Sequence, residues 1–475
     1  MLFNSLPFLC FIPLFFALYF GTSGKARLWV CLMGSYLFYG WWDWRFLFLI
    51  QLLTLISYYS ALKIGEYAEE PKKKARFRML SVVSSLVVLG FFKYFNFFAD
   101  NVVSLFGMLG MHASYTTLTI ILPVGISFYT FQTIGYTVDV YRGKIPVERS
   151  LLNFAVYVAF FPQLVAGPIV RASNFLPQLR EDQPISGKNV ILGLQMILWG
   201  YVLKSVVADS LSLVVDPRFN DPFRYDSFSL FIGAFFYSFQ IYGDFAGYSY
   251  IAIGIAKILG IDFRENFNRP YFSSSFSEFW QRWHISLSSW LRDYLYIPLG
   301  GNRQGKLRTD INRMLTMLLG GLWHGASWNF VIWGGLHGLY LMLQRVVRTG
   351  FDSVFPHVNL KRLWFKIPLV LLIYAACNFA WIFFRAETLA ESGYIVGRLF
   401  DFGSYHIGVV PHMFHVMKGF ALILMVIVLE LFAFIYPLEG YREKTWFIVA
   451  SIAASLLLIG FLGTFGNAAF IYFQF

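Results

Sequence analysis

Two histidines are the side chains best suited to acid–base chemistry; one lies in one of the most apolar parts of the chain, and the other lies in the most polar stretch at membrane-like depth. His324 lies in GGLWHGASWN (320–329), and His284 lies in FSEFWQRWHISLSSWLRDYLYIPLGGNR (276–303). A neutral imidazole titrates at about pH 6.5, so it takes up and returns a proton without the cost of burying a permanent charge. A histidine at membrane depth is usually turned inward and functional. We therefore identify His324 as a candidate general base.

Each of these features also has a purely structural interpretation. A lone buried histidine can be a neutral core residue that is hydrogen-bonded to a backbone carbonyl. Gly320, Gly321 and Gly325 remove side chains around His324, which admits a thin substrate or only lets helices pack closely. His337 follows His324 by thirteen residues, so on one ideal helix the two would face widely different directions and would not share a site.

The spacing of polar and apolar residues in 276–303 predicts an amphipathic helix. One polar stripe at helical spacing consists of Arg282, Ser286, Ser289 and Asp293. Glu278 and Arg282 are four residues apart and can pair. His284 shares a second stripe with Trp280, Leu287 and Leu291, so it should face an aromatic and apolar surface. Such a helix, with several tryptophans, is also suited to lying in the membrane interface.

The amino-acid composition is that of a membrane protein, so this chemistry would take place within or beside a lipid bilayer. The 475 residues are 57% hydrophobic and only 13% charged, whereas soluble proteins carry about a quarter charged residues. The net charge of +12 is concentrated in short loops, which indicates membrane topology rather than nucleic-acid binding. Three cysteines (Cys10, Cys31 and Cys377) lie far apart, and no HExxH, GxSxG or phosphate-cradling motif occurs. We expect neither a metal nor a bound cofactor.

Hydrophobic patterning predicts an all-α polytopic membrane protein. A bilayer crossing needs about 20 apolar helical residues, and the apolar stretches amount to roughly ten to twelve segments. Two long stretches, 227–260 and 312–344, are interrupted by polar and glycine-rich pieces, which suggests broken or paired helices. The count also requires 151–168 or a neighbour to dip into the membrane and return. We find no internal repeat, so we expect a single domain over 1–475 with a motif-bearing core at about 118–345.

Lysine and arginine set the expected orientation. The basic runs 71–78, 141–144 and 301–308 should be cytoplasmic, whereas 101–117 and 399–417 are nearly free of lysine and arginine and should be outside. The first twenty residues lack the basic region and cleavage site of a signal peptide. We expect them to be a retained first span that starts outside.

The two histidine-bearing segments also carry a resemblance. Together they resemble the signature of the membrane-bound O-acyltransferase (MBOAT) family, in its bacterial branch of alginate O-acetyltransferase-like proteins. The resemblance extends to 122–143, FFPQLVAGPIVR (160–171), 242–260, ENFNRPY (265–271) and the terminal IYFQF, and so covers most of the chain. It implies an MBOAT-type helical fold with broken helices around a central conduit, and an O-acyltransferase activity.

For this family the resemblance implies a specific reaction. Acetyl would move from cytoplasmic acetyl-CoA, the probable donor, across the bacterial inner membrane to an extracytoplasmic polysaccharide such as alginate, cellulose or peptidoglycan. The two catalytic positions of the family fall on His324 and His284, and we assign the base to His324 and an orienting or polarising role to His284. The expected outer loops are too short to fold a polysaccharide-binding cleft, so another protein should hold the polymer. The resemblance implies that this partner is a separate periplasmic acetyltransferase of the SGNH type.

Further residues are candidates for contact with the substrates. Those expected to line the substrate path are Trp280, Trp283, Ser288, Trp323 and Asn329. Those expected to attract the phosphates of coenzyme A are Arg282, Arg292, Arg303 and Lys306, although positive-inside topology explains the same charges.

Two other classes of function remain open at this stage. In a proton-coupled transporter or flippase of a lipid-linked sugar, His284, His324 and Asp244 would form a proton relay. In a structural anchor for a polysaccharide synthase, both histidines would be dispensable. Reaction with labelled acetyl-CoA distinguishes an acyltransferase from both.

Overall fold

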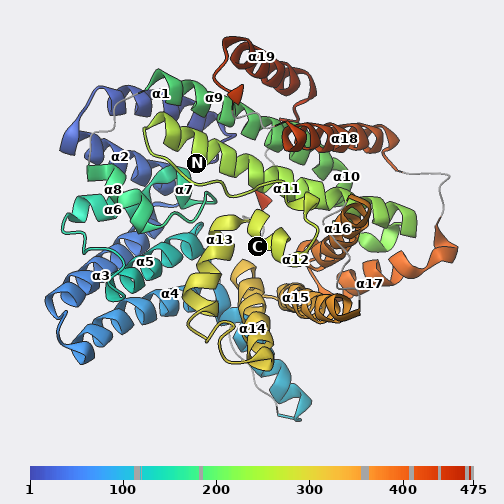
Figure 1. Cartoon of the computed structure of the whole chain (residues 1–475), viewed down its shortest axis with the longest axis horizontal. Coiled ribbons are helices and arrows are strands. Elements are labelled where there is room, and N and C mark those ends of the chain that lie inside the picture. The colour runs from blue at the N-terminus through green and yellow to red at the C-terminus, as the bar shows by residue number, and fades with distance from the viewer. Residues whose placement is uncertain are drawn as a thin grey trace. The chain divides into compact units, whose positions relative to one another are not determined.

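The structure, a computed structural model, describes residues 1–111, 118, 120–180, 186–354, 363–405, 411–436, 440–465 and 470–471. Within these ranges the regular structure is helical and contains no strand. The predicted all-α fold is confirmed. The helices are labelled in Figure 1.

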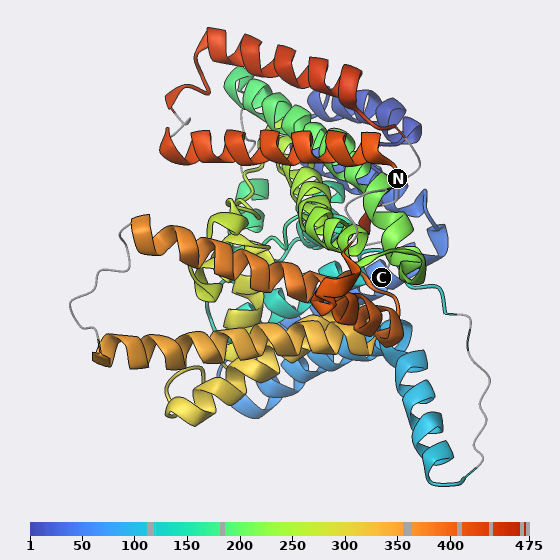
Figure 2. The same cartoon turned by 90° about the vertical axis from the view of Figure 1, so that its right-hand side faces the viewer.

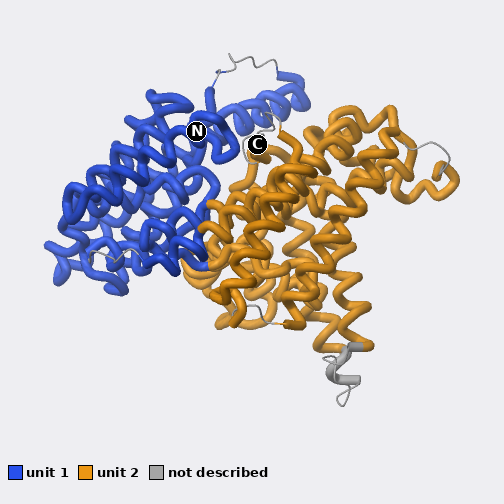
Figure 3. The backbone as a smooth tube through the Cα atoms, turned by 90° about the horizontal axis from the view of Figure 1, so that it is seen from above, with its two compact units in different colours: residues 1–193, 252–264 blue, residues 194–251, 265–475 orange. Residues whose placement is uncertain are grey.

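The chain divides into two compact units, which Figure 3 colours separately. The first comprises residues 1–193 and 252–264, and the second comprises 194–251 and 265–475. Two helices, α9 (Gly187–Tyr201) and α11 (Ser227–Ile258), contribute residues to both units. The division therefore runs through helices rather than through a linker, and the single-domain interpretation stays a prediction.

The first unit contains the N-terminal helices. They are α1 (Leu6–Phe20), α2 (Gly24–Gly40), α3 (Leu47–Glu66), α4 (Pro71–Met108), α5 (Ile126–Tyr141), α6 (Leu151–Ala159), α7 (Phe161–Leu164) and α8 (Ala172–Arg180). Helices α3, α4 and α5 pack against one another. Because α4 continues to Met108, the first part of the expected outer loop 101–117 is helical, whereas 112–117 lie outside the described residues.

Seven helices in the described part of the chain are long and apolar enough to cross a membrane. They are Trp44–Glu66, Pro71–Met108, Gly187–Asn220, Trp328–Gly350, Trp364–Arg385, Met413–Ile435 and Thr445–Leu462. The helix Leu6–Phe20 is apolar but shorter. Each of the seven exceeds or approaches the roughly 20 residues that a bilayer core requires. The chain is therefore a multi-pass membrane protein.

The second unit holds the two histidine-bearing segments. Its helices after α11 are α12 (Phe276–Arg282), α13 (Ile285–Leu291), α14 (Lys306–His324), α15 (Trp328–Val354), α16 (Leu363–Arg385), α17 (Leu389–Phe400), α18 (Met413–Ile435) and α19 (Thr445–Leu462), and α10 (Asp209–Asn220) precedes α11. Helices α14 and α15 lie side by side in Figures 1 and 2 and pack extensively against each other.

The predicted interruption of 312–344 is confirmed, and glycines explain its packing. Helix α14 ends at His324, and α15 begins at Trp328. A Cβ on Gly321 would lie 2.2 Å from the backbone oxygen of Phe330, and one on Gly334 would lie 2.3 Å from that of Met317. These pairings run in opposite directions along the two helices, so α14 and α15 form a tight antiparallel hairpin. Of the two interpretations left open for the glycines, helix packing holds for Gly321.

The expected interruption of 227–260 is wrong, because α11 is continuous. Its 32 residues would extend about 48 Å. The glycines that suggested a break instead bring helices close together: a Cβ on Gly243 would lie 2.9 Å from the oxygen of Leu203, and one on Gly247 would lie 2.7 Å from that of Gly200. In α11, Gly243 and Gly247 therefore mark close approach to a neighbouring helix and not a break.

Candidate active site

The segment 276–303 is not the single helix that its periodicity predicts. It forms α12, α13 and a short π-helix, η5 (Arg292–Tyr296). The break falls at His284, whose φ of 41° lies in the left-handed region, where a non-glycine residue costs about 1–2 kcal/mol. The predicted polar stripe is therefore interrupted. Its one predicted ion pair, Glu278–Arg282 at 2.8 Å, lies within α12 and is confirmed.

Backbone hydrogen bonds on both sides of His284 hold this break. The amide of Asn268 donates to the carbonyl of Arg282 at 2.9 Å, and the amide of Ile285 donates to the carbonyl of Asn266 at 2.9 Å. They satisfy backbone groups that a broken helix leaves without intrahelical partners. The segment that contains ENFNRPY therefore fixes the bend, and the His284 side chain is fully buried there.

The His284 ring lies among aromatic side chains, as predicted. Its centroid is 4.6 Å from that of Phe245 in an edge-on arrangement, 6.0 Å from Trp323 and 6.3 Å from Phe267. An imidazole in such surroundings is desolvated, and the charged form is disfavoured unless an anion pairs with it. The polar groups that its ring meets within hydrogen-bond distance are a neutral amide and a hydroxyl. His284 is therefore expected to be neutral.

Asn266 is the main polar partner of His284, and the sequence analysis did not single it out. Its Oδ1 lies 3.1 Å from His284 Nδ1 and accepts from the backbone amide and the hydroxyl of Ser286, at 3.2 and 2.8 Å. Its Nδ2 donates to Ser249 Oγ at 3.1 Å. The other ring nitrogen of His284, Nε2, is buried and has no hydrogen-bond partner among the described residues.

His324 occupies the end of α14, where Gly325 leaves the helix with an extended backbone. The side chain is buried, at 5% exposure. Its ring centroid lies 4.8 Å from Trp323, 5.0 Å from Trp333 and 5.0 Å from Phe384, all in edge-on arrangements. A Cβ on Gly325 would lie 2.0 Å from the ring of Phe330, so the glycine lets the chain turn directly after the histidine.

Trp323 joins the two candidate catalytic histidines. Its indole contacts the ring of His284 at 6.0 Å and that of His324 at 4.8 Å between centroids. The histidines are 40 positions apart in the sequence: His284 lies at the break between α12 and α13, and His324 ends α14. The fold therefore places two buried imidazoles next to one indole.

His337 lies in the same aromatic cluster, contrary to the sequence interpretation. Its centroid is 4.9 Å from that of Trp333, which also contacts His324. The interpretation assumed one continuous helix, but the hairpin folds α15 back along α14. Neither ring nitrogen of His337 has a hydrogen-bond partner within the part of the chain that the structure describes.

The candidate path-lining residues fall into two groups. Trp280, Trp283 and Trp323 lie in the aromatic cluster; Trp280 contacts the His337 ring at 5.0 Å, and Trp283 contacts Tyr242 at 6.3 Å. The polar candidates, Ser288 and Asn329, make hydrogen bonds that hold local structure. The Ser288 hydroxyl donates to the carbonyl of Trp283 at 3.1 Å.

Asn329 also has a structural role. Its Nδ2 donates to the carbonyl of Ala386 at 2.8 Å, and its Oδ1 accepts from the Ser392 hydroxyl at 3.0 Å. These bonds link the start of α15 to the residues around α17. Both polar groups of the Asn329 side chain are used in these bonds, and its place along the substrate path stays a prediction.

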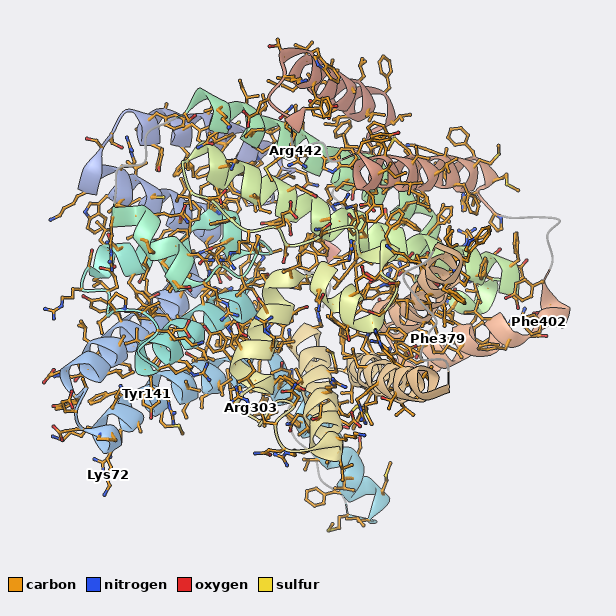
Figure 4. All side chains as sticks on the ribbon, viewed as in Figure 1. Lys72, Tyr141, Arg303, Phe379, Phe402 and Arg442 are labelled. Atoms are coloured by element: carbon orange, nitrogen blue, oxygen red, sulfur yellow. The ribbon has the colours of Figure 1, made fainter. Side chains whose placement is uncertain are left out.

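The candidate phosphate-binding cations differ in their surroundings. Arg282 is half-buried and donates to the carbonyl of Asn268 in addition to its pairing with Glu278. Arg292 pairs with Asp293 at 2.8 Å. Arg303, labelled in Figure 4, is exposed in the turn that precedes α14, and Lys306 is exposed at the first residue of α14. Arg303 and Lys306 are therefore better placed to meet a ligand from solution than Arg282.

Asp244, proposed for a proton relay in the transporter interpretation, is instead part of a buried ion cluster. Its carboxylate pairs with Lys204 at 2.5 Å, and Lys204 also pairs with Asp209 at 2.9 Å. The backbone amide of Ile471 donates to Asp244 at 2.8 Å. Throughout the described ranges, no group of three or more His, Cys, Asp or Glu side chains is placed to hold a metal ion.

Comparison with known proteins agrees with the family resemblance of the sequence. Residues 145–383 match the model of the membrane-bound O-acyltransferase (MBOAT) family. The probable alginate O-acetylase AlgI of Azotobacter vinelandii is 42% identical over 85% of this chain and 79% of that protein. The corresponding protein of Pseudomonas aeruginosa is 41% identical over 86% and 76%. The peptidoglycan O-acetyltransferase of Helicobacter pylori is 35% identical over 82% and 78%.

Proposed function

Because the chain belongs to the membrane-bound O-acyltransferase family and is therefore an O-acyltransferase, we propose that it transfers acetyl groups from cytoplasmic acetyl-CoA across the bacterial inner membrane. The acceptor is a hydroxyl on the other side, which leads to O-acetylation of an extracytoplasmic polysaccharide. One observation carries the assignment to a site: two buried histidines, His284 and His324, contact the same indole.

The chemistry at these histidines is an acyl exchange between sulfur and oxygen. The hydroxyl oxygen forms a bond to the acetyl carbonyl carbon, and the carbon–sulfur bond of the thioester breaks. His324 accepts the hydroxyl proton and returns it to the sulfur, so coenzyme A leaves as a free thiol. A positioned base of this kind typically supplies about 10²–10⁴ in rate. The aromatic surroundings exclude water, which limits hydrolysis of the thioester.

The donor enters from the cytoplasmic side in this proposal. The exposed cations Arg303 and Lys306 lie in the basic run 301–308, which the positive-inside rule places in the cytoplasm. They attract the phosphates of coenzyme A, with Arg282 and Arg292 as further candidates. Helix α14 begins at Lys306 in this basic run and ends at His324. Its 19 residues extend about 28 Å, which is close to the thickness of one bilayer core.

The acceptor polysaccharide requires a second protein. The described loops form no domain that could hold a polymer, since an independent domain needs at least about 50 residues. The named acceptors of the relatives, alginate and peptidoglycan, are both extracytoplasmic polymers. In this proposal, a periplasmic acetyltransferase of the SGNH type receives the acetyl group from this chain and transfers it to the polymer.

Reconstitution tests this proposal. The purified chain in detergent should turn over labelled acetyl-CoA slowly or only to water, and acetylation of the polymer should require the added partner. The partner without the chain is the matched control. Efficient acetylation of polymer by the chain alone would contradict the two-component proposal, and indifference to acetyl-CoA under all conditions would contradict the proposed function itself.

A further inference from the structure

The hydrogen bonds of Asn266 determine which ring nitrogen of His284 carries the proton. A neutral imidazole has one N–H donor and one acceptor nitrogen, and which is which follows from the groups they meet. His284 Nδ1 lies 3.1 Å from Asn266 Oδ1. If this oxygen is an acceptor, Nδ1 must carry the hydrogen, because two acceptors at this distance would repel.

The orientation of the Asn266 amide is fixed by a backbone group. The amide of Ser286 lies 3.2 Å from the Asn266 atom that faces it, and a backbone N–H can only donate. Turning the Asn266 amide over would place an NH₂ group against this N–H, so the facing atom must be oxygen. Ser249 Oγ, 3.1 Å from the Nδ2 atom on the other side, accepts the amide hydrogen.

The hydroxyl of Ser286 agrees with this assignment. It lies 2.8 Å from Asn266 Oδ1 and 3.4 Å from His284 Nδ1, so its hydrogen is directed to the nearer oxygen. The hydroxyl therefore does not supply a donor to Nδ1. The remaining ring nitrogen, Nε2, then has a lone pair, and within the described chain nothing donates to it.

We infer that Asn266 is a positioning residue that holds His284 as the Nδ1–H tautomer, so that Nε2 presents a lone pair to a hydroxyl or thiol of the reactants. The inference rests on the proposed function for the identity of the reactants, but the tautomer rests on geometry alone. It also narrows the role of His284. A polarising role would need Nε2–H, whereas an accepting Nε2 orients the attacking hydroxyl by taking a hydrogen bond from it as it binds, before that single hydrogen passes to His324 in the transfer step.

This arrangement follows a general principle of activated sites. A histidine that contacts a reactant is commonly held by a third group that fixes its tautomer and ring orientation. Here Asn266 is the third group, and Ser249 Oγ accepts a hydrogen bond from the Asn266 amide and so fixes its orientation. The strained left-handed backbone at His284 is maintained by the same segment, through the bond from Ile285 to the Asn266 carbonyl.

The kinetic test compares two asparagines of one segment. In Asn266→Ala, kcat for acetyl transfer from acetyl-CoA in the presence of the partner should fall by about 10- to 100-fold, because a misoriented catalytic group costs rate. KM for acetyl-CoA should stay within about twofold, since Asn266 is not placed at the phosphate-binding residues. Asn266→Asp keeps an acceptor oxygen and should recover most of the loss.

The matched control is Asn268→Ala. The Asn268 side chain accepts from Arg269 Nε at 3.2 Å, and both hydrogen bonds between Asn268 and Arg282 use only backbone atoms of Asn268. This variant should retain wild-type kcat. Equal losses in both alanine variants, or an Asn266→Ala variant within twofold of wild type, would overturn the inference.

A spectroscopic readout separates this inference from the proposed function. In the full chain labelled with ¹⁵N-histidine, the His284 resonances are identified by their loss in His284→Asn. The wild type should show a protonated Nδ1 and an unprotonated Nε2, and Asn266→Ala should lose this single tautomer. A proton on Nε2 in the wild type would overturn the inference even in an active enzyme. If the tautomer is as inferred and acetyl-CoA is not consumed, only the proposed function fails.

Discussion

Replacing His324 by phenylalanine is expected to lower acetyl transfer by about 10²–10⁴-fold, the usual contribution of a positioned general base. Phenylalanine keeps a planar ring of similar size against Trp323, Trp333 and Phe384, so the aromatic cluster should remain packed. The variant should therefore reach the membrane in normal amount and elute as the wild type does in detergent. Polysaccharide O-acetyl content in cells that carry only the variant measures the effect.

His337→Phe is the matched control for this experiment. His337 is also buried, also contacts Trp333, and undergoes the same chemical change. Since neither of its ring nitrogens has a partner among the described residues, the substitution removes no described hydrogen bond. We expect this variant to retain acetylation. Normal acetylation in His324→Phe, or an equal loss in both variants, would remove the base assignment.

The second large effect is expected at His284. His284→Ala should reduce acetyl transfer severely, because it removes the acceptor that orients the hydroxyl and leaves Asn266 Oδ1 without its imidazole partner. His284→Asn should recover part of the activity, since an amide oxygen can accept a hydrogen bond but does not titrate at neutral pH. Initial rates of acetyl transfer with the partner present measure both variants.

Two outcomes of this experiment would contradict the orienting role of His284. If alanine and asparagine are equally inactive, the orienting role has no support and proton transfer by His284 itself becomes the better explanation. If both variants are as active as the wild type, His284 is a packing residue. The asparagine variant is informative because an orienting group and a titrating group respond to it in opposite ways.

The sequence predicted the class of fold and the two histidines, but not how they come together. Apolar runs of about 20 residues need no tertiary information to be identified as membrane helices. The sequence periodicity correctly placed His284 toward aromatic side chains. The periodicity did not predict that the helix breaks at His284. The backbone hydrogen bonds that hold this break come from Asn266 and Asn268, which lie outside the segment 276–303.

Glycine positions show a second limit of sequence patterns. GGLWHGAS and YGDFAGYS look alike as interruptions, yet α14 ends in the first and α11 runs through the second. The difference lies in which backbone each glycine approaches, and that is a property of the packed partner helix. The role of Asn266 was hidden for the same reason: an asparagine in a short motif becomes a positioning residue only when its amide meets an imidazole.

The most direct test of the account is the direction of acetyl transfer across the membrane. Inverted membrane vesicles expose the cytoplasmic face, so the thioester donor can be supplied there while the partner and acceptor are enclosed in the lumen. With labelled acetyl-CoA outside, the account predicts that label accumulates on luminal acceptor in vesicles with the wild-type chain and not in vesicles with His324→Phe. Equal luminal labelling in both kinds of vesicle, or none in either despite an active partner, would contradict it.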